Sequence, residues 1–218
     1  MEYDFLHWLG HASFKIKSEG IVAYIDPFRL KGKMEHADIV FITHPHFDHL
    51  HEESIGLIAD GKTHFVSPAD KEGKLRGRNV TIVRPGDSGE VLGIKFEAVH
   101  AYNTHPDKLN FHPKGNSWVG YIITVNGKRI YHPGDTDFIA EMRGIDVDLA
   151  LLPCGGKYVM DIDDAIKASK VIRAKHFAPM HYKAILGKDG SDALEKRFAE
   201  QIKNAILLKD EGEPAYSF

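Results

Sequence analysis

Four residues with side chains that bind metals lie close together in the sequence: His44, His46, Asp48 and His49. They directly follow the run from Asp38 to Thr43, whose apolar and β-branched residues are typical of a strand buried on both faces. Side chains two positions apart in an extended segment point to the same side, so His44 and His46 can bind one cation. Asp48 and His49 come where the chain turns toward a predicted helix, so they can face a second cation. This density of ligands behind a buried strand argues against a loop of surface histidines.

Imidazole nitrogen and carboxylate oxygen are good ligands for zinc, and they also bind manganese or iron. The sequence therefore predicts two divalent metal ions, with zinc as the first choice and manganese or iron as alternatives. Thiolate ligation is not expected, because the single cysteine, Cys154, lies at the end of an apolar run and is predicted to be packed.

Two further candidate ligands follow predicted strands in the second half of the chain. Asp135 comes shortly after the run from Lys128 to His132, and Gly134 before it permits a tight turn. His181 directly follows the strand-like run from Lys175 to Met180. A capping aspartate and a core histidine are the ordinary interpretations of such residues. Their shared placement at strand ends favours a common site.

The spacing from His44 to His49 matches the HxHxDH motif of the metallo-β-lactamase superfamily, which this chain resembles along nearly its whole length. The matching segments run from Trp8 to Ser13, Ile25 to Pro27, Ile130 to Asp137, Leu151 to Gly156 and Pro179 to Tyr182. The chain is most similar to the stand-alone metal-dependent hydrolase branch, which includes ascorbate-6-phosphate lactonase-like proteins. The resemblance implies an α/β (α+β) fold, a four-layer αββα sandwich, with the site at one edge between the sheets.

The resemblance also implies a role for each candidate ligand. His44 and His46 would bind the first metal, Asp48 and His49 the second, Asp135 both, and His181 the second.

The third ligand of the first metal is where the chain departs from the pattern. Relatives carry a histidine after the strand that here runs from Ile94 to Val99, and this chain has Asn103 in its place. An amide oxygen is a weaker zinc ligand than imidazole, so we expect His100 narrowly ahead of His112, of His105 or of Asn103 itself. His112 belongs to an insertion that resembles one found in a subset of the branch.

Two other residues are candidates for supporting roles. His11 lies in the opening motif, where it would contact substrate or hydrogen-bond to a ligand, with a core histidine as the alternative. Asp26 would orient a metal-bound histidine or simply end its strand.

The chemistry that this centre would support is hydrolysis by a metal-activated water, since two cations that share a water lower its pKa toward about 7. Asp48 is the expected catalytic residue, which orients or deprotonates that water. We expect an ester, lactone or phosphodiester substrate. The alternatives are a nucleotide phosphodiesterase or nuclease, a redox di-iron protein, and a non-catalytic metal-containing sensor, which the unusual Asn103 keeps open.

The composition narrows the partners and the setting. The 218 residues predict a single domain over 1–218. With 28 basic and 31 acidic residues the net charge is −3, so nucleic acid is not an expected partner and a small-molecule substrate is. The sequence has neither a secretory signal pattern nor an apolar run long enough to span a membrane, and its one cysteine suits a reducing compartment. We therefore expect a cytoplasmic location without membrane attachment, and a homo-oligomer stays open.

The ligands must be positioned by strands and helices that alternate along the chain. The sequence predicts a hairpin around Asn126-Gly127 between strands 119–125 and 128–132, since this pair favours type I′ turns. It predicts further strands at 3–9, 12–16, 21–25, 38–43, 63–66, 80–83, 94–99, 148–152, 175–180 and 205–209, and helices at 52–59, 161–173 and 192–204.

Overall fold

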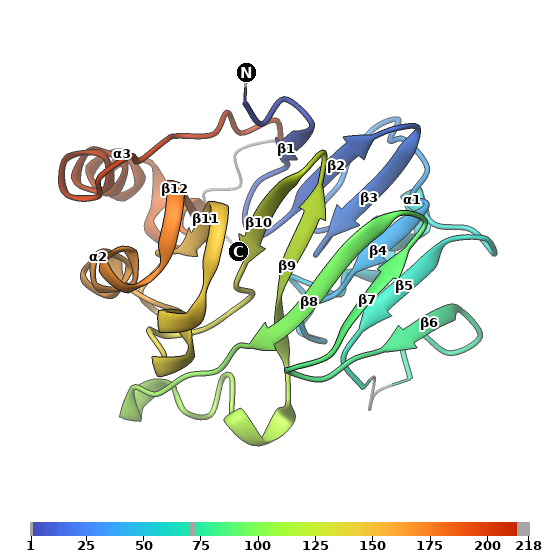
Figure 1. The fold of residues 1–218 in the computed structure, drawn as a ribbon, viewed down its shortest axis with the longest axis horizontal. Helices are drawn as coiled ribbons and strands as arrows, with labels where there is room; N and C mark the ends of the chain where they lie inside the picture. The colour runs from blue at the N-terminus through green and yellow to red at the C-terminus, as the bar shows by residue number, and fades with distance from the viewer. Residues whose placement is uncertain (1, 70–72, 213–218) are drawn as a thin grey trace.

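Two six-stranded mixed sheets face each other in the computed structural model, which describes residues 2–69 and 73–212 (Figure 1). The first sheet contains, in spatial order, β1 (Leu6–Trp8), β2 (Phe14–Ser18), β3 (Ile21–Ile25), β4 (Ile39–Phe41), β5 (His64–Ser67) and β6 (Asn79–Ile82). The second contains β12 (Arg173–Met180), β11 (Asp146–Pro153), β10 (Lys128–His132), β9 (Val119–Val125), β8 (Ile94–His100) and β7 (Ser88–Val91). The three-residue-per-turn helices η1 (Pro106–Lys108), η2 (Lys114–Asn116) and η3 (Ala140–Gly144) lie in connections of the second half.

The main hydrophobic core lies between the two sheets. Phe41 of β4 contacts Phe96 of β8 and Tyr121 of β9, with ring centroids 5.7 and 5.3 Å apart. Each fully buried large apolar side chain contributes about 1.5–3 kcal/mol relative to an exposed one. This contact joins the two sheets. The candidate ligands follow strands of both sheets.

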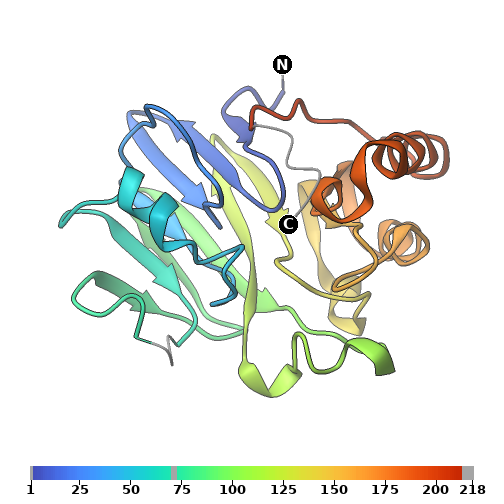
Figure 2. The ribbon, with the colours of Figure 1, turned by 180° about the vertical axis from the view of Figure 1, so that it is seen from behind.

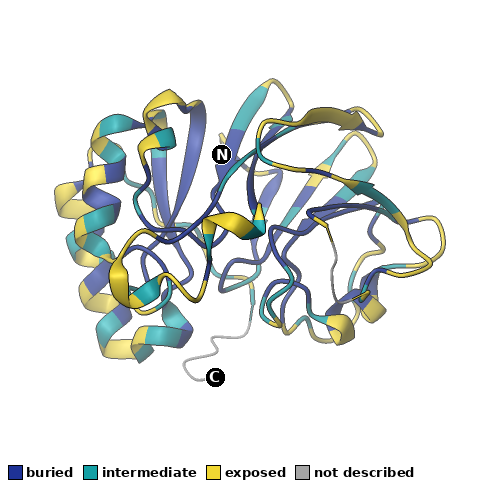
Figure 3. Ribbon diagram, turned by 90° about the horizontal axis from the view of Figure 1, so that it is seen from below, coloured by how far each residue is buried: buried dark blue, intermediate teal, exposed yellow. Residues whose placement is uncertain are grey.

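Helices cover the outer face of each sheet. α1 (Glu52–Ile58) packs Ile55 and Ile58 on the first sheet (Figure 2). α2 (Ile162–Val171) and α3 (Lys183–Gln201) lie on the outside of the second sheet and turn exposed faces outward (Figure 3). The order helix, sheet, sheet, helix confirms the predicted four-layer αββα sandwich. Of the described helices, none is both long and apolar enough to cross a membrane.

Most of the predicted elements are confirmed, and the exceptions have physical reasons. The predicted turn is present, with φ of 52° at Asn126 and 70° at Gly127. α3 begins nine residues before the predicted helix at 192–204, because the helix resumes after a kink at Gly187. The predicted last strand at 205–209 is wrong, since Ala205 makes only an isolated bridge to Phe177.

The strand ends explain where a site can form. β10, β11 and β12 run parallel, so their carboxyl ends meet at the same edge of the second sheet. Asp135 follows β10 and His181 follows β12, while His44 follows β4 of the facing sheet. Three separate parts of the sequence therefore deliver candidate ligands to one edge of the sandwich.

Candidate metal centre

The loop after β4 is anchored by Asp26, which directly follows β3. Its carboxylate accepts hydrogen bonds from the backbone nitrogen and the hydroxyl of Thr43, at 2.8 and 2.6 Å. It also accepts one from Nδ1 of His49 at 2.7 Å, which leaves the other ring nitrogen, Nε2, for the centre. Asp26 is fully buried and has a φ of 44°, a conformation that Asp and Asn adopt more readily than other side chains except glycine. The orienting role expected for Asp26 therefore has a geometric basis.

His44, His46 and His112 form a first donor group. One ring nitrogen from each lies within 4.8 Å of the others. The hydroxyl of Thr43 donates to Asp26, so it can accept from Nδ1 of His44 at 3.0 Å and leave Nε2 of His44 for a metal.

His11, Asp48, His49 and His181 form a second donor group, again with donor atoms within 4.8 Å of one another. Nε2 of His11 lies 3.0 Å from Oδ2 of Asp48. The backbone nitrogen of His181 donates to the carbonyl of His11 at 3.0 Å, and the two rings lie 3.7 Å apart. Two segments far apart in the sequence are thus joined at this group.

Asp135 lies between the two donor groups. Its Oδ1 is 3.2 Å from Nε2 of His49, and its Oδ2 is 3.2 Å from Nε2 of His181. The same Oδ2 is 3.3 Å from Nε2 of His112 in the first group. One carboxylate therefore touches side chains of both groups.

Gly134 is required for this placement of Asp135. Its φ is 64°, and a Cβ atom there would lie 2.9 Å from the carbonyl oxygen of Val119 and 3.0 Å from Cβ of Thr43. A larger residue would be strained and would push β9 or the loop after β4 away.

Burial and neighbouring charges favour the metal-binding forms of His44, His46 and Asp135. Burial lowers the pKa of His44 well below its ordinary value and that of His46 to about 4, which favours the neutral imidazole that binds metals. Burial alone would raise the pKa of Asp135, but the imidazoles of His181 and His49 hold it well below its usual range.

The donor atoms fit a metal because several are buried without a hydrogen bond to any described residue. These atoms are Nε2 of His49, Nε2 of His112, Nε2 of His181 and Oδ1 of Asp135. A buried polar atom left unpaired costs about 1–3 kcal/mol, so each of the four needs a partner. Cations bound by imidazole and carboxylate ligands would satisfy them in both donor groups.

The structure brings together all but two of the predicted site residues. His44, His46, Asp48, His49, Asp135 and His181 meet at the centre, together with His11 and His112. Asn103 lies beside them, hydrogen-bonded to His112.

His100, the favoured third ligand, is the residue that lies apart. It is half-buried and lines a separate cavity of about 420 Å³ with Val99, Glu97 and Glu141. Past the end of β8, the rings of His100 and Tyr102 lie 6.1 Å apart, whereas the side chain of Asn103 contacts His112. His105, the other alternative, is exposed beside Asp107. The position of a third imidazole is taken by His112.

Trp118 is a residue of this centre that the sequence did not indicate. Its ring lies 5.0 Å from that of His44, 4.9 Å from that of His46 and 5.7 Å from that of His112. It thus packs against every ring of the first donor group. The signal available in the sequence was only an aromatic residue directly before a predicted strand.

Comparison with known proteins agrees with this fold. A family model described as the beta-lactamase superfamily domain matches residues 5–181. The chain belongs to this superfamily, in its metallo-β-lactamase form, and is a metal-dependent hydrolase of the stand-alone branch.

Individual relatives cover nearly the whole chain. A UPF0173 metal-dependent hydrolase from Thermoplasma volcanium is 35% identical over 219 residues, which cover 95% of this chain and 96% of that protein. A crystal structure described as a metal-dependent hydrolase from Parabacteroides distasonis superposes with a TM-score of 0.81 at 29% identity, over 94% of this chain and 93% of that one. A metallo hydrolase from the archaeon Ignicoccus hospitalis gives a TM-score of 0.71 at 27% identity, over 95% of both chains.

Proposed function

We propose that the chain is a two-metal hydrolase that acts on a small-molecule ester, lactone or phosphodiester. Zinc is the favoured metal, with manganese and iron as alternatives. His44, His46 and His112 would hold one ion, and Asp48, His49 and His181 the other, with Asp135 between them. The observation that carries the proposal is the contact of Asp135 with both donor groups, at 3.2 and 3.3 Å.

The chain's own residues would then position the reacting groups. Bound cations would lower the pKa of a water toward about 7 and polarise the carbonyl or phosphoryl oxygen of the substrate. Asp48 is the proposed catalytic residue, because it is the carboxylate of the second group with some exposure, 13%, against 3% for Asp135. His11 holds one oxygen of Asp48, so the carboxylate keeps a fixed orientation while it accepts a hydrogen bond from water and orients it. His11 would thus act through Asp48, in line with the supporting role expected for it.

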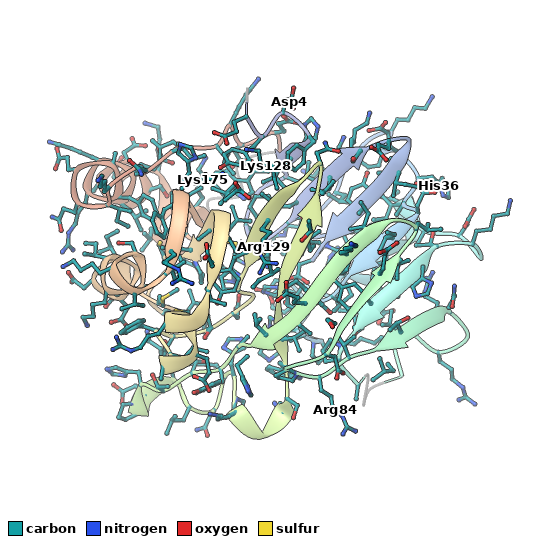
Figure 4. The ribbon with its side chains drawn as sticks, viewed as in Figure 1. Asp4, His36, Arg84, Lys128, Arg129 and Lys175 are labelled. Carbon is teal, nitrogen blue, oxygen red and sulfur yellow. The ribbon has the colours of Figure 1, made fainter. Side chains whose placement is uncertain are left out.

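The net charge of −3 favours a small substrate over a polynucleotide. Lys128 and Lys175 lie near the starts of β10 and β12, the ends opposite to Asp135 and His181 (Figure 4). They pair with Glu2 and Asp148 at 2.6 and 2.5 Å. Phosphate binding by polynucleotides depends on unneutralised lysine and arginine near the site. A nuclease is therefore the weaker alternative.

The sensor alternative rested on a missing imidazole in the first group. His112 supplies that imidazole, with a donor atom within 4.8 Å of those of His44 and His46. This geometry favours a complete catalytic centre over a degenerate one.

Metal analysis and a substrate panel test the proposal together. Purified protein should retain about two equivalents of metal, and His46→Ala and His112→Ala should each lose one. His100→Ala is the matched control and should retain both. Chromogenic phosphodiester, lactone and thioester substrates, each tested with zinc, manganese and iron, then identify the bond that is cleaved. A fully metallated protein that cleaves none of them would contradict the proposed substrate classes and favour the sensor.

A further inference from the structure

His112 differs from the other candidate ligands in how the chain holds it. His44, Asp135 and His181 each follow a strand closely, whereas His112 lies in the long connection between β8 and β9, after η1 and before η2. The ring of a histidine in such a connection needs a separate contact to fix its direction. That contact decides which nitrogen the ring presents to a metal.

Asn103 makes this contact through both its backbone and its side chain. Its backbone nitrogen donates to the carbonyl of His112 at 2.8 Å. Its Oδ1 lies 2.6 Å from Nδ1 of His112, and its Nδ2 donates to the carbonyl oxygen of Tyr158 at 3.0 Å. Asn103 and His112 are 3% and 2% exposed, so water does not compete for these bonds. Asn103 therefore ties the loop of His112 to the segment around Tyr158.

Only one orientation of the amide satisfies both side-chain contacts. The carbonyl oxygen of Tyr158 can only accept, so the NH2 group of Asn103 must face it. Oδ1 of Asn103 can also only accept, so Nδ1 of His112 must carry the proton and donate. In the neutral ring, Nε2 then carries the lone pair.

The lone pair of His112 faces the shared carboxylate. Nε2 lies 3.3 Å from Oδ2 of Asp135 and makes no hydrogen bond to any described residue. In the neutral ring, these two electron-rich atoms repel each other at this distance unless a metal ion or a proton lies between them. The tautomer that Asn103 imposes is thus the one that a metal at this point requires.

We propose that Asn103 is a positioning residue, which fixes the ring direction and tautomer of His112 so that Nε2 is presented to the first metal. The inference rests on the proposed function, which assigns His112 to that metal. Oδ1 of Asn103 already accepts from the ring, so Asn103 acts through His112 and does not bind the metal itself. The residue at the place of the expected third ligand instead supports the histidine that replaces it.

The test compares Asn103→Leu, which removes both side-chain hydrogen bonds, with Asn103→Asp, which keeps the acceptor for Nδ1 of His112. Asn110→Leu, an exposed asparagine of the same connection, is the matched control. Zinc affinity of each purified protein is measured by competition with a chromogenic chelator, alone and in a His112→Ala background. Loss of a histidine-orienting partner costs about 10- to 100-fold in metal affinity. We expect that loss for Asn103→Leu, a far smaller one for Asn103→Asp, and none for Asn110→Leu.

The His112→Ala background distinguishes failure of this inference from failure of the proposed metal centre. In His112→Ala protein, Asn103→Leu should cause no further loss, because the residue through which it acts is gone. An equal loss in both backgrounds, or wild-type affinity of Asn103→Leu, would overturn the inference while leaving the proposed metal centre intact. Wild-type zinc affinity of His112→Ala itself would instead remove the proposed ligand, and the inference with it.

A second measurement reads the tautomer in the wild-type protein. Long-range proton–nitrogen NMR spectra of zinc-loaded wild-type protein distinguish the two tautomers of each imidazole, and the spectrum of His112→Ala serves only to assign the signal. A proton on Nδ1 of His112 is expected, and a proton on Nε2 would overturn the inference.

Discussion

The two donor groups consist of similar side chains but are held in different ways. In the second group, His49 is hydrogen-bonded to the fully buried Asp26. The backbone nitrogen of His181 donates a hydrogen bond to the carbonyl of His11. In the first group, His46 is half-buried, and His112 lies in a long connection where Asn103 orients its ring.

This difference concerns the cost of ordering the ligands. A side chain that is already fixed by buried hydrogen bonds loses little conformational freedom when a metal binds. A half-buried side chain such as that of His46 must lose more. We therefore expect the second group to bind its metal more tightly than the first.

The largest effect should come from the one residue that the two groups share. Asp135→Ala removes the carboxylate that lies 3.2 Å from His49 and 3.3 Å from His112. Because loss of a mere supporting partner costs about 10- to 100-fold, loss of a direct ligand should weaken both metals by more than about 100-fold. Metal content after gel filtration measures this, with Asp107→Ala, which removes an exposed carboxylate, as control. Retention of one equivalent at wild-type affinity would assign Asp135 to a single group.

A change at Asp26 should affect the second group more than the first. Asp26 contacts His49 directly but reaches His44 only through the hydroxyl of Thr43. Asp26→Asn keeps the shape and tolerates the φ of 44°, but it cannot accept all of the hydrogen bonds from Thr43 and His49. We expect a loss of about 10- to 100-fold in affinity for the more tightly bound metal. We also expect a fall of about 1–3 kcal/mol in the free energy of unfolding, measured on metal-free protein.

The control for this variant is Asp38→Asn, which alters a carboxylate that accepts from the backbone nitrogen of Val22, away from the donor groups. It should change stability without changing metal affinity. If Asp26→Asn weakened the first metal as strongly as the second, the two groups would not be held independently.

The candidate ligands that closely follow strands could be predicted from the sequence. His44 to His49 are neighbours in the chain, so their proximity needs no tertiary information. Asp135 and His181 follow strands that the local pattern predicts, and the carboxyl ends of parallel strands meet at one edge. Here local structure and the resemblance to a family lead to the same residues.

The choice between His100 and His112 could not be made in this way. The path of the chain after β8 is set by contacts between distant segments. Oδ2 of Asp137 accepts from the backbone nitrogens of Thr104 and His105, both at 2.8 Å, and so holds the beginning of the loop. These partners lie too far apart in the sequence for a local pattern to reveal their contact. The sequence therefore favoured His100, the histidine nearest to the strand end.

Edge and terminal elements were similarly hard to predict. β7 was missed because Ser88, Gly89 and Glu90 are exposed and polar, so they lack the apolar alternation of a half-buried strand. The start of α3 was missed because the backbone leaves the helical conformation at Gly187, with φ of 66°, before the helix resumes.

Removal of metal in steps should sharpen the comparison between the two groups. A chelator added in increasing amounts to the protein loaded with two zinc ions should take the ion of the first group first. We expect dissociation constants that differ by about tenfold, or about 1.4 kcal/mol. Thermal unfolding followed at each step should show a smaller decrease for the first ion than for the second, since a ligand stabilises in proportion to the logarithm of its affinity. A single step with both ions lost together would show that the groups are coupled through Asp135.

The smallest effect should come from Trp118, which contacts every ring of the first group but donates no ligand atom. Contacts between aromatic rings contribute about 0.5–1.5 kcal/mol beyond the area that they bury. Trp118→Phe keeps part of this contact and should weaken the first metal only a few-fold, and Trp118→Ala somewhat more.

The two tryptophans of the chain make this prediction directly measurable. Trp118 packs on the first group, whereas Nε1 of Trp8 donates to the carbonyl oxygen of His11 in the second group at 3.0 Å. In wild-type protein, zinc should change the emission in two phases, with Trp8 responding at the lower and Trp118 at the higher zinc concentration. Trp118→Phe should remove the second phase and leave the first. An unchanged second phase in that variant would mean that Trp118 does not sense the first metal, and that the two groups differ less than their hydrogen bonds indicate.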